Sequence, residues 1–400
     1  MKGIPHSGRV SLLVLYVALF TKLHAQTGFV HLSKGKLVDG NNAAVKLNGV
    51  NLGGWLLWEG WIWGGKFKSE SSIKARMTEM FGKDQADKYI SAYYNSFITA
   101  EDIRAIARLG MNAVRLPVNH SLFERDEDPG LIRPEGFRYI DSVIAWAKHY
   151  KVYVIIDLHA APGGQSPYFI SDPDKKNLWK DPQNRARTLQ VWKALAERYK
   201  NEEWVGAYDL LNEPIPGKDE NLLLMYKDLI ETIRSVDKDH LLIIEGKAFA
   251  TRFDFFTGTL DPNQVFSFHF YTWFVADPVK KLNQYSSFAK NLNVPMWCGE
   301  WGEDKPQKIN RNLQLLNDSA FDFCGSAFWT WKRVEKDPNR PALNRIALNA
   351  ESTEVIKWLN GNGKKPDPET ARQGMEDFIR ALLLEKTVEN AELKTILKIQ

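Results

Sequence analysis

Two glutamates that follow apolar runs are the residues best suited to chemistry in this chain. Glu213 lies in YDLLNEP and Glu300 lies in CGEWG. A carboxylate at the end of an apolar strand carries a desolvation cost unless it is paired or functional. Glycoside hydrolysis requires two facing carboxyl groups, because one must protonate the departing oxygen while the other attacks the sugar carbon or activates a water. The pair therefore indicates a hydrolytic site.

Other polar or aromatic side chains also end apolar runs. They are Arg115, His159, Asn212, His269, Tyr271 and Trp329. Arg115 and Tyr271 are suited to keep one carboxylate ionised, because an adjacent cation and a phenol hydrogen bond both favour the charged form. Asn212 can offer its amide to a sugar hydroxyl. One such residue is consistent with a structural ion pair, whereas a set of this size indicates a site.

The apolar runs themselves predict eight strands. They lie at 44–50, 111–116, 152–158, 205–211, 241–244, 265–271, 295–300 and 326–331. Amphipathic helical stretches are predicted at 100–109, 134–149, 185–199, 220–236, 279–291 and 307–321. Repeated strand-then-helix order is typical of a parallel sheet, and eight such units predict an α/β (β/α)8 TIM barrel. An open doubly wound sheet is the alternative, but no glycine-rich dinucleotide fingerprint supports it.

In this barrel the chemistry lies at the carboxyl ends of the strands. Glu213 and Glu300 end the fourth and seventh strands, so we expect them to face each other across the barrel mouth. A β-hairpin at 28–43 is expected to plug the opposite, bottom end.

The two ends of the chain predict further segments. In residues 1–25, Lys2 and Arg9 precede an apolar run at 10–20 that leads to Ala25. This order is typical of a cleaved signal peptide and predicts a secreted or periplasmic protein. Residues 26–362 are predicted as the catalytic domain and 363–400 as a helical C-terminal extension. The extension is interpreted either as a cap packed on the barrel or as a partner-binding tail.

Composition excludes several other functions. The 400 residues include 53 Lys+Arg and 49 Asp+Glu, a net charge of +4 that falls almost to zero without residues 1–25, so we expect no nucleic-acid partner. No apolar run is long enough to span a bilayer. We expect no metal site, because the eight histidines show no metal-binding spacing. We also expect a monomer without a cofactor. Cys298 and Cys324 are expected as buried free thiols, with Cys298 on the same strand face as Glu300.

Tryptophan is unusually frequent, with 14 copies. Eight of them fall at or just after predicted strand ends: Trp55, Trp58, Trp61, Trp63, Trp273, Trp301, Trp329 and Trp331. Flat aromatic faces suit the stacking of neutral sugar rings. We therefore expect most of this surplus to form a sugar-binding surface.

Six motifs occur in the order of a known family. They are NAVRLPVN, IIDLHAAPGG, YDLLNEP, SFHFY, CGEWG and FWTWK. From about residue 45 to 358 the chain resembles glycoside hydrolase family 5, the cellulase family of retaining barrels. The resemblance implies that Glu213 is the acid/base and Glu300 the nucleophile, and that the six residues named with them above complete the catalytic subsite. A non-catalytic sugar-binding barrel is the alternative, but it would be expected to have lost a carboxylate.

The resemblance also bears on the substrate. The segment GVNLGGWLLWEGWIWGG resembles the first loop of the exo-1,3-glucanase branch, in which Glu59 would contact the terminal sugar. After Gln165, however, SPYFISDPDKKNLW departs from that branch. We predict retaining hydrolysis of β-glucosidic linkages in a neutral β-glucan or derived oligosaccharide, in the manner of an exo-β-1,3-glucanase or β-glucosidase. An endo-β-1,4-glucanase or mannanase of the same family is the alternative.

Overall fold

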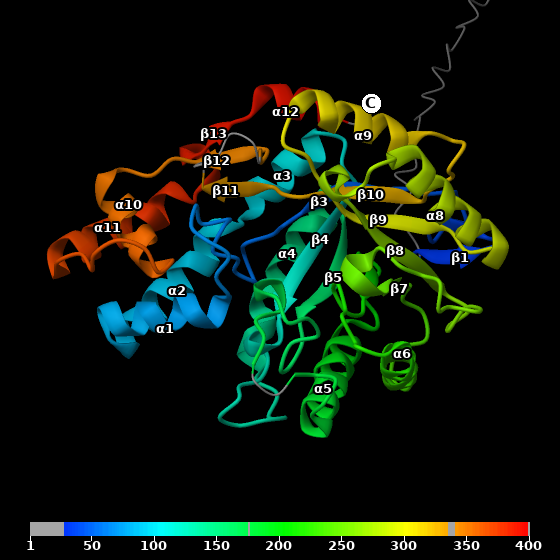
Figure 1. The fold of residues 1–400 in the computed structure, drawn as a ribbon, viewed down its shortest axis with the longest axis horizontal. Coiled ribbons are helices and arrows are strands. Elements are labelled where there is room, and N and C mark those ends of the chain that lie inside the picture. The colour runs from blue at the N-terminus through cyan, green and yellow to red at the C-terminus, as the bar shows by residue number, and fades with distance from the viewer. Residues whose placement is uncertain (1–27, 175–176, 335–340, 399–400) are drawn as a thin grey trace, which may run out of the picture.

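The structure is a computed structural model that describes residues 28–174, 177–334 and 341–398. The barrel strands are β3 (Leu47–Asn51), β4 (Ala113–Asn119), β5 (Tyr153–Ala160), β6 (Val205–Asp209), β7 (Leu242–Glu245), β8 (Gln264–Phe270), β9 (Met296–Trp301) and β10 (Gly325–Phe328). Within the described residues these eight strands form a closed parallel barrel in the order β10-β3-β4-β5-β6-β7-β8-β9 (Figure 1). Each strand overlaps one predicted apolar run, so the predicted TIM barrel is confirmed.

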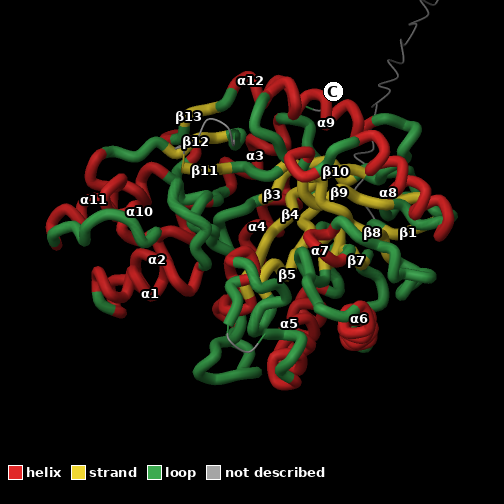
Figure 2. The backbone as a smooth tube through the Cα atoms, in the orientation of Figure 1, coloured by secondary structure: helices red, strands yellow, loops and turns green. Residues whose placement is uncertain are grey.

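Helices connect the strands and surround the barrel (Figure 2). They are α1 (Glu70–Phe81), α2 (Lys83–Phe97), α3 (Ala100–Arg108), α4 (Arg138–Tyr150), α5 (Pro182–Tyr199), α6 (Asp219–Arg234), α7 (Lys247–Ala250), α8 (Pro278–Leu292), α9 (Pro306–Asn317), α10 (Ala350–Leu359), α11 (Pro368–Ala381) and α12 (Ala391–Leu397). The six predicted helical stretches correspond to α3, α4, α5, α6, α8 and α9. The sequence did not predict α1 and α2, and α1 is mostly polar, with only Ile73 and Met77 as buried apolar side chains.

Local sequence signals start several of these helices. Thr99 and Asp102 form a capping box that satisfies the first amide groups of α3. The side chain of Asp181 accepts a hydrogen bond from the backbone of Gln183 at the start of α5, and Asp277 does the same for α8. In both α5 and α8 a proline follows the cap, where its missing N–H costs nothing.

An N-terminal hairpin of β1 (His31–Ser33) and β2 (Lys36–Val38) precedes the barrel, as predicted. Its Val30 and Leu37 side chains are buried in one cluster with Leu47, Val265 and other residues from the amino ends of the barrel strands. The backbone N–H of Leu32 also donates to the side chain of Asn263 at 2.8 Å. The hairpin therefore closes the bottom of the barrel and leaves the other end open for a site.

Strand β9 contains a β-bulge. Cys298 pairs with Phe268 of β8, and the next paired residue, Glu300, pairs with His269 of β8. Gly299 therefore has no partner on β8 and is the extra residue of the bulge. An extra residue reverses the alternation of side chains along a strand. A Cβ on Gly299 would lie 2.5 Å from the hydroxyl oxygen of Ser267, which explains why glycine occupies this position.

The C-terminal segment packs against the barrel over most of its length. Helix α11 lies against α2 and α10, and α12 lies against α9 (Figure 1). Between them, β13 (Val388–Glu389) pairs with β12 (Asn344–Ile346), which pairs with β11 (Lys332–Val334). The Lys332 ammonium is buried and donates to the carbonyl of Leu382 at 2.9 Å while it pairs with Asp102 at 2.6 Å. Among the described helices, none is both long and apolar enough to cross a bilayer.

Candidate active site

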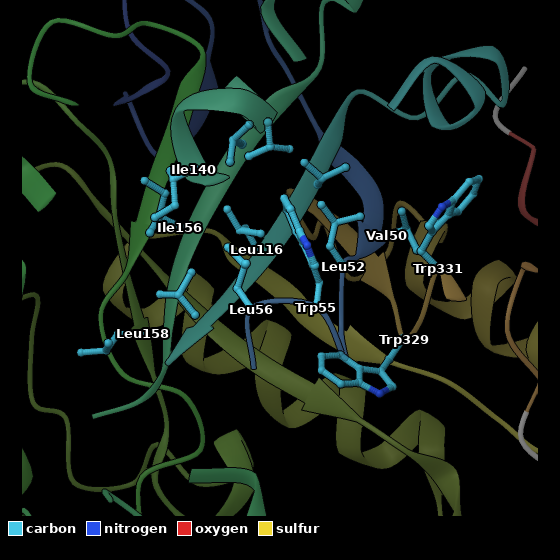
Figure 3. Packing of buried hydrophobic residues seen from close by; sticks show 14 of the residues in the cluster. Val50, Leu52, Trp55, Leu56, Leu116, Ile140, Ile156, Leu158, Trp329 and Trp331 are labelled. Atoms are coloured by element: carbon cyan, nitrogen blue, oxygen red, sulfur yellow. The ribbon is translucent and has the colours of Figure 1, made fainter. Parts of the chain in front are cut away.

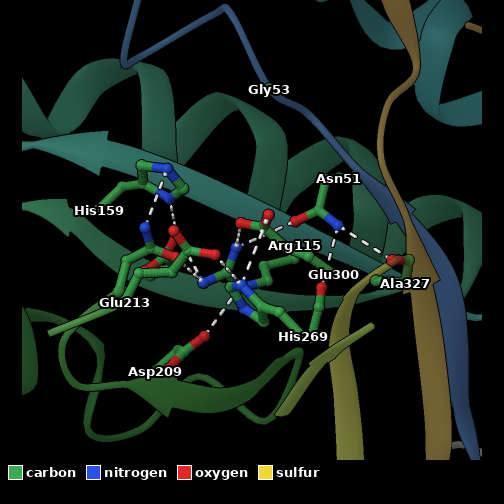
Figure 4. A network of polar contacts seen from close by, with 12 residues as sticks. Asn51, Gly53, Arg115, His159, Asp209, Glu213, His269, Glu300 and Ala327 are labelled. Carbon is green, nitrogen blue, oxygen red and sulfur yellow. Dashed lines mark hydrogen bonds and ion pairs between the residues drawn. The ribbon is translucent and has the colours of Figure 1, made fainter. Parts of the chain in front are cut away.

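Arg115 lies at the centre of a buried polar network inside the barrel (Figure 4). It projects inward from β4, and its nitrogen atoms contact four carboxylates that come from β5, β6, β7 and β9. The distances are 3.1 Å to Asp157, 2.7 Å to Asp209, 3.0 Å to Glu245 and 2.7 Å to Glu300. Charges removed from water in this way persist only when they are paired and hydrogen-bonded. The guanidinium therefore orients the acids beneath the mouth of the barrel, and burial raises the pKa of Asp157 and of Asp209 so that they need no cation of their own.

Glu213 follows β6 and is held at both its backbone and its side chain. Its φ of 46° is left-handed, which is uncommon for a residue other than glycine, and its N–H donates to Glu245 Oε2 at 2.6 Å. Its Oε1 lies 2.6 Å from Nδ1 of His269. Burial raises the pKa of the Glu213 carboxyl, and the hydrogen bond from His269 opposes this rise only in part. A raised pKa suits a group that must hold a proton to donate.

Glu300 ends β9 on the other side of the site. It accepts hydrogen bonds from Arg115 at 2.7 Å and from the Tyr271 hydroxyl at 3.0 Å. Burial raises the pKa of the Glu300 carboxyl, but the charges of His269 and Arg115 outweigh it and leave the pKa below its ordinary value of 4.5. One Glu300 oxygen lies within 4.8 Å of one Glu213 oxygen. Retaining glycosidases hold their two carboxyl groups at about 5–5.5 Å, and inverting ones at about 6.5 Å or more.

His159 and Asn212 occupy the floor between these acids. His159 Nδ1 lies 2.6 Å from Asp157 Oδ2, and its Nε2 lies 3.2 Å from the Asn212 amide nitrogen. Burial lowers the pKa of His159 to about 3, so its ring is neutral, donates to Asp157 and accepts from Asn212. The Asn212 oxygen accepts from Arg115 at 2.9 Å, which leaves the second amide hydrogen of Asn212 for a ligand.

A cavity of about 960 Å³ opens above this floor. Eight of the nine residues predicted for the site line it, and the ninth, Arg115, lies directly beneath. The loop between β3 and α1 forms one wall with Glu59, whose Oε2 accepts from the Trp61 indole at 2.6 Å. Burial raises the pKa of Glu59 to about 8. Trp329 covers the floor with its ring stacked on His159 at 5.6 Å between centroids.

Three of these residues could in principle hold a metal ion. Ligand atoms of Glu213, His269 and Glu300 lie within 4.8 Å of one another. His269, however, already pairs with Glu213, and the pKa of its ring is well above the ordinary value because Glu300 and Glu245 outweigh the opposing effect of burial. A protonated imidazole repels a cation and has no free lone pair. The arrangement fits proton transfer better than metal binding.

Comparison with known proteins decides the family. The model of the cellulase family, glycosyl hydrolase family 5, matches residues 64–334. The chain belongs to glycosyl hydrolase family 5. A probable glucan 1,3-β-glucosidase A of Aspergillus clavatus is 32% identical over 309 residues, which cover 70% of this chain and 73% of the relative. The family assigned by the six sequence motifs is thus confirmed.

Other relatives of this family 5 chain carry different names. A β-xylosidase of Phanerodontia chrysosporium is 32% identical over 57% of this chain, and endoglucanase C of Acetivibrio thermocellus is 29% identical over 62%. The chain spans only 48% and 63% of the lengths of these two proteins. The rutinosidase structure from Aspergillus niger has a TM-score of 0.58 at 21% identity, covering 72% of this chain and 90% of its own. That likeness shows the fold alone.

The expectation that most of the surplus tryptophans form a sugar-binding surface is wrong. Five of the eight are packed in the core with 1% or less of their surface exposed: Trp55, Trp58, Trp63, Trp301 and Trp331. Figure 3 shows Trp55 and Trp331 among other buried hydrophobic side chains. The indoles of Trp55 and Trp63 donate to the backbone of Tyr94 at 2.7 Å and to the hydroxyl of Tyr93 at 3.0 Å. These contacts attach the loop after β3 to α2. Of the eight, Trp61, Trp273 and Trp329 line the cavity of this family 5 chain.

The two cysteines are buried and free, as expected, but Cys298 does not share a strand face with Glu300. The bulge at Gly299 separates their orientations, so Cys298 packs in the outer core beside Phe268 whereas Glu300 points into the barrel. Cys324 belongs to the separate cluster inside the bottom of the barrel.

Four acids of the site were not among the predicted site residues, and one of them, Asp157 in β5, contacts Arg115 at 3.1 Å. Asp209 and Glu245 end β6 and β7 and contact Arg115. Each is a charged residue at the end of an apolar strand, which is the pattern that identified the predicted site residues. Glu303 had no such signal, because it lies beyond β9 and accepts hydrogen bonds from the Thr272 backbone at 2.8 Å and the Trp273 indole at 2.7 Å.

Proposed function

We propose that the chain is a retaining glycoside hydrolase that releases β-linked glucose units from a neutral β-glucan or a derived oligosaccharide. The observation that supports this most directly is the pair of carboxyl groups whose oxygens come within 4.8 Å, with the pKa of Glu213 raised and that of Glu300 lowered. The surroundings of the two groups thus favour a protonated Glu213 and an ionised Glu300. Double displacement needs one carboxyl group in each of these states.

In the first step the ionised Glu300 attacks the anomeric carbon, and Glu213 gives its proton to the glycosidic oxygen as that bond breaks. A glycosyl ester on Glu300 results. In the second step Glu213 takes a proton from an incoming water, which attacks the same carbon and releases Glu300. Two inversions give net retention. Tyr271, which donates to Glu300 at 3.0 Å, remains protonated because burial raises its pKa.

The choice of a glucose unit and of cleavage from the chain end has independent support. The relatives named above include a probable glucan 1,3-β-glucosidase. The loop after β3 places Glu59 and Trp61 in the cavity wall, and this loop is fixed by its buried tryptophans. A rigid wall on this side favours a pocket that takes a chain end over a groove open at both sides.

Residues 1–25 carry the pattern of a signal peptide, and we propose export to the periplasm or the medium on that pattern alone. They lie outside the described residues. Comparing the N-terminal sequence of the protein recovered from culture medium or periplasm with that of the encoded chain tests this proposal. Recovery of the uncut chain inside the cell would contradict it.

Activity is tested with laminarin, carboxymethylcellulose and glucomannan side by side, with the anomer of the first product recorded by NMR. We expect β-glucose as the first product from laminarin. Oligosaccharide ladders from cellulose or glucomannan would replace the exo proposal with endo cleavage. Binding without hydrolysis of any glycan would replace it with a sugar-binding function.

The nucleophile is tested with Glu300→Ala. Turnover is expected to fall by at least about 10⁴-fold, because no covalent ester can form, while laminari-oligosaccharide binding persists. Azide is small enough to attack from the vacated side, so it should restore activity and yield an α-glycosyl azide. A variant that keeps the full rate would exclude Glu300 as the nucleophile.

A further inference from the structure

The cavity extends beyond the catalytic residues into a region lined by apolar side chains. We call this region the apolar wing. It is formed by Phe67, Tyr168, Phe169, Ile170, Ala248 and Phe249. Its aromatic rings pair across loops: Phe67 stacks on Phe169 with centroids 5.0 Å apart, and Tyr168 lies 5.2 Å from Phe249. Three separate loops thus contribute to one apolar surface.

The apolar wing is exposed as well as apolar. Phe67, Tyr168 and Phe249 expose 57%, 49% and 40% of their surface. The described chain has eight large hydrophobic side chains in this exposed class, and four of them line this one cavity, the fourth being Trp273 at 42%. Apolar surface concentrated at one place marks a binding site, because covering it removes that surface from water.

The apolar wing lies on the side of the acid. Glu213 follows β6, whose neighbours in the barrel are β5 and β7. Tyr168 and Phe169 come from the loop after β5, and Phe249 comes from the loop after β7. These two loops therefore flank Glu213, the group assigned to protonate the departing oxygen. A leaving group protonated by Glu213 would therefore lie next to these loops.

The backbone at Phe249 is strained in a way that fits this placement. Ala248, Phe249 and Ala250 have φ values of 54°, 60° and 53°, the left-handed region that costs about 1–2 kcal/mol for each such residue. Consecutive residues of this kind cluster at ligand-binding sites. The Phe249 ring lies at the cavity beside Tyr168 and is not part of the core.

The chemistry of the apolar wing favours hydrocarbon over sugar. Of its six side chains only Tyr168 carries a hydroxyl, whereas a buried sugar unit needs partners for several hydroxyl groups. The segment that supplies Tyr168, Phe169 and Ile170 is the one at which the sequence departs from the exo-1,3-glucanase pattern.

We propose that the apolar wing is a leaving-group subsite for an apolar aglycone, so that the preferred substrates are β-glucosides of alkyl or aryl alcohols. This proposal rests on the proposed function for the identity of the sugar and for the role of Glu213. It ranks the groups that depart: glucan chain ends remain substrates, and glucosides of apolar alcohols are hydrolysed with a higher kcat/KM.

A series of alkyl β-glucosides that differ only in chain length tests the proposal. For methyl, butyl and octyl β-glucoside, each below its critical micelle concentration, kcat/KM should rise by up to about fourfold for every methylene that enters the apolar wing. We expect an increase of at least about thirtyfold from methyl to octyl. A flat series, or laminaritriose and cellotriose exceeding octyl β-glucoside, would overturn the proposal.

Three variants test whether the apolar wing causes the dependence of kcat/KM on alkyl chain length. Phe249→Asn keeps a residue that tolerates the left-handed backbone, and it should lower the octyl-to-methyl ratio of kcat/KM by at least about fivefold. Phe67→Asn, on the opposite loop, is expected to act in the same direction and does not depend on that strained turn. Leu131→Asn is the matched control, because Leu131 is 59% exposed outside the cavity and should leave the ratio unchanged. Equal ratios in all four proteins would contradict the assignment.

Two further measurements distinguish failure of this proposal from failure of the proposed function. β-Glucosyl fluoride has no aglycone, so its hydrolysis reports on the sugar subsite alone, and absence of hydrolysis counts against the proposed function. Calorimetry with octyl and methyl 1-thio-β-glucoside needs no turnover. We expect at least about tenfold tighter binding of the octyl compound, lost in Phe249→Asn. Equal affinities would reject the apolar subsite even if the fluoride is hydrolysed.

Discussion

Arg115 and Glu300 are joined by a 2.7 Å bond from Nη1 to Oε1, inside the barrel and away from solvent. The same guanidinium reaches three more acids, so Glu300, the proposed nucleophile, is part of the network that closes the centre of the fold. Stability and reactivity therefore depend on one side chain, and the two effects can be measured separately.

Arg115→Met should destabilise the protein by about 3–5 kcal/mol, because it leaves several buried acids without their cation. The pKa of Glu300 should also rise, since Arg115 is one of the charges that lower it. Urea unfolding measures the first effect, and the acidic limb of the kcat/KM profile, shifted to higher pH, measures the second. Lys83→Met, which removes a pair on the surface, is the control and should change stability by about 1 kcal/mol or less.

Glu213→Gln should separate proton donation from the other steps. Hydrolysis of unactivated glucosides should fall by at least about 10³-fold, whereas 2,4-dinitrophenyl glucoside, whose leaving group needs no proton, should lose far less in the glycosylation step. The basic limb of the pH profile, set by loss of the Glu213 proton, should disappear. Equal losses for both substrates would show that Glu213 is not the acid.

Glu59 should make stability fall at alkaline pH. Its pKa is about 8 in the folded protein against an ordinary value of 4.5, so the folded state holds a proton that the unfolded chain releases. The stabilisation is complete below pH 4.5 and is lost as pH rises to about 8, by at most about 5 kcal/mol. Glu59→Gln keeps an acceptor for Trp61 and should abolish this dependence. Thermal unfolding from pH 4 to 9 measures the pH dependence of stability. Parallel stability curves for the wild type and Glu59→Gln would refute the prediction.

A chain that ends at Asn362 should not fold stably. Met375 and Phe378 of α11 are fully buried, and the Phe378 ring lies 5.2 Å from that of Trp63, which anchors the loop carrying Glu59. Phe378→Ala, which keeps the whole chain, should cost about 3–5 kcal/mol. Circular dichroism and urea unfolding measure both variants. A truncated chain with native stability would show that residues 26–362 form an independent domain.

The sequence allowed the barrel to be predicted because its parallel strands are apolar on both faces and end in polar residues. The same pattern located Glu213 and Glu300, and it applied equally to Asp209 and Glu245, which were overlooked. The tryptophans were misjudged for a different reason. The positions of Trp58 and Trp63 in the loop after β3 do not reveal that this loop folds back onto α2, a helix whose existence the sequence did not indicate.

The bulge was also beyond prediction, because a lone glycine in an apolar strand does not show that the neighbouring strands omit a residue there. Its presence constrains how this strand can be reused. A designer who transplants β9 with Gly299 into another barrel keeps Glu300 facing inward only if the partner strand is one residue shorter at that point. Regular pairing along a β9 that retains Gly299 would put Glu300 on the same face as Cys298 and turn the carboxylate toward the helices.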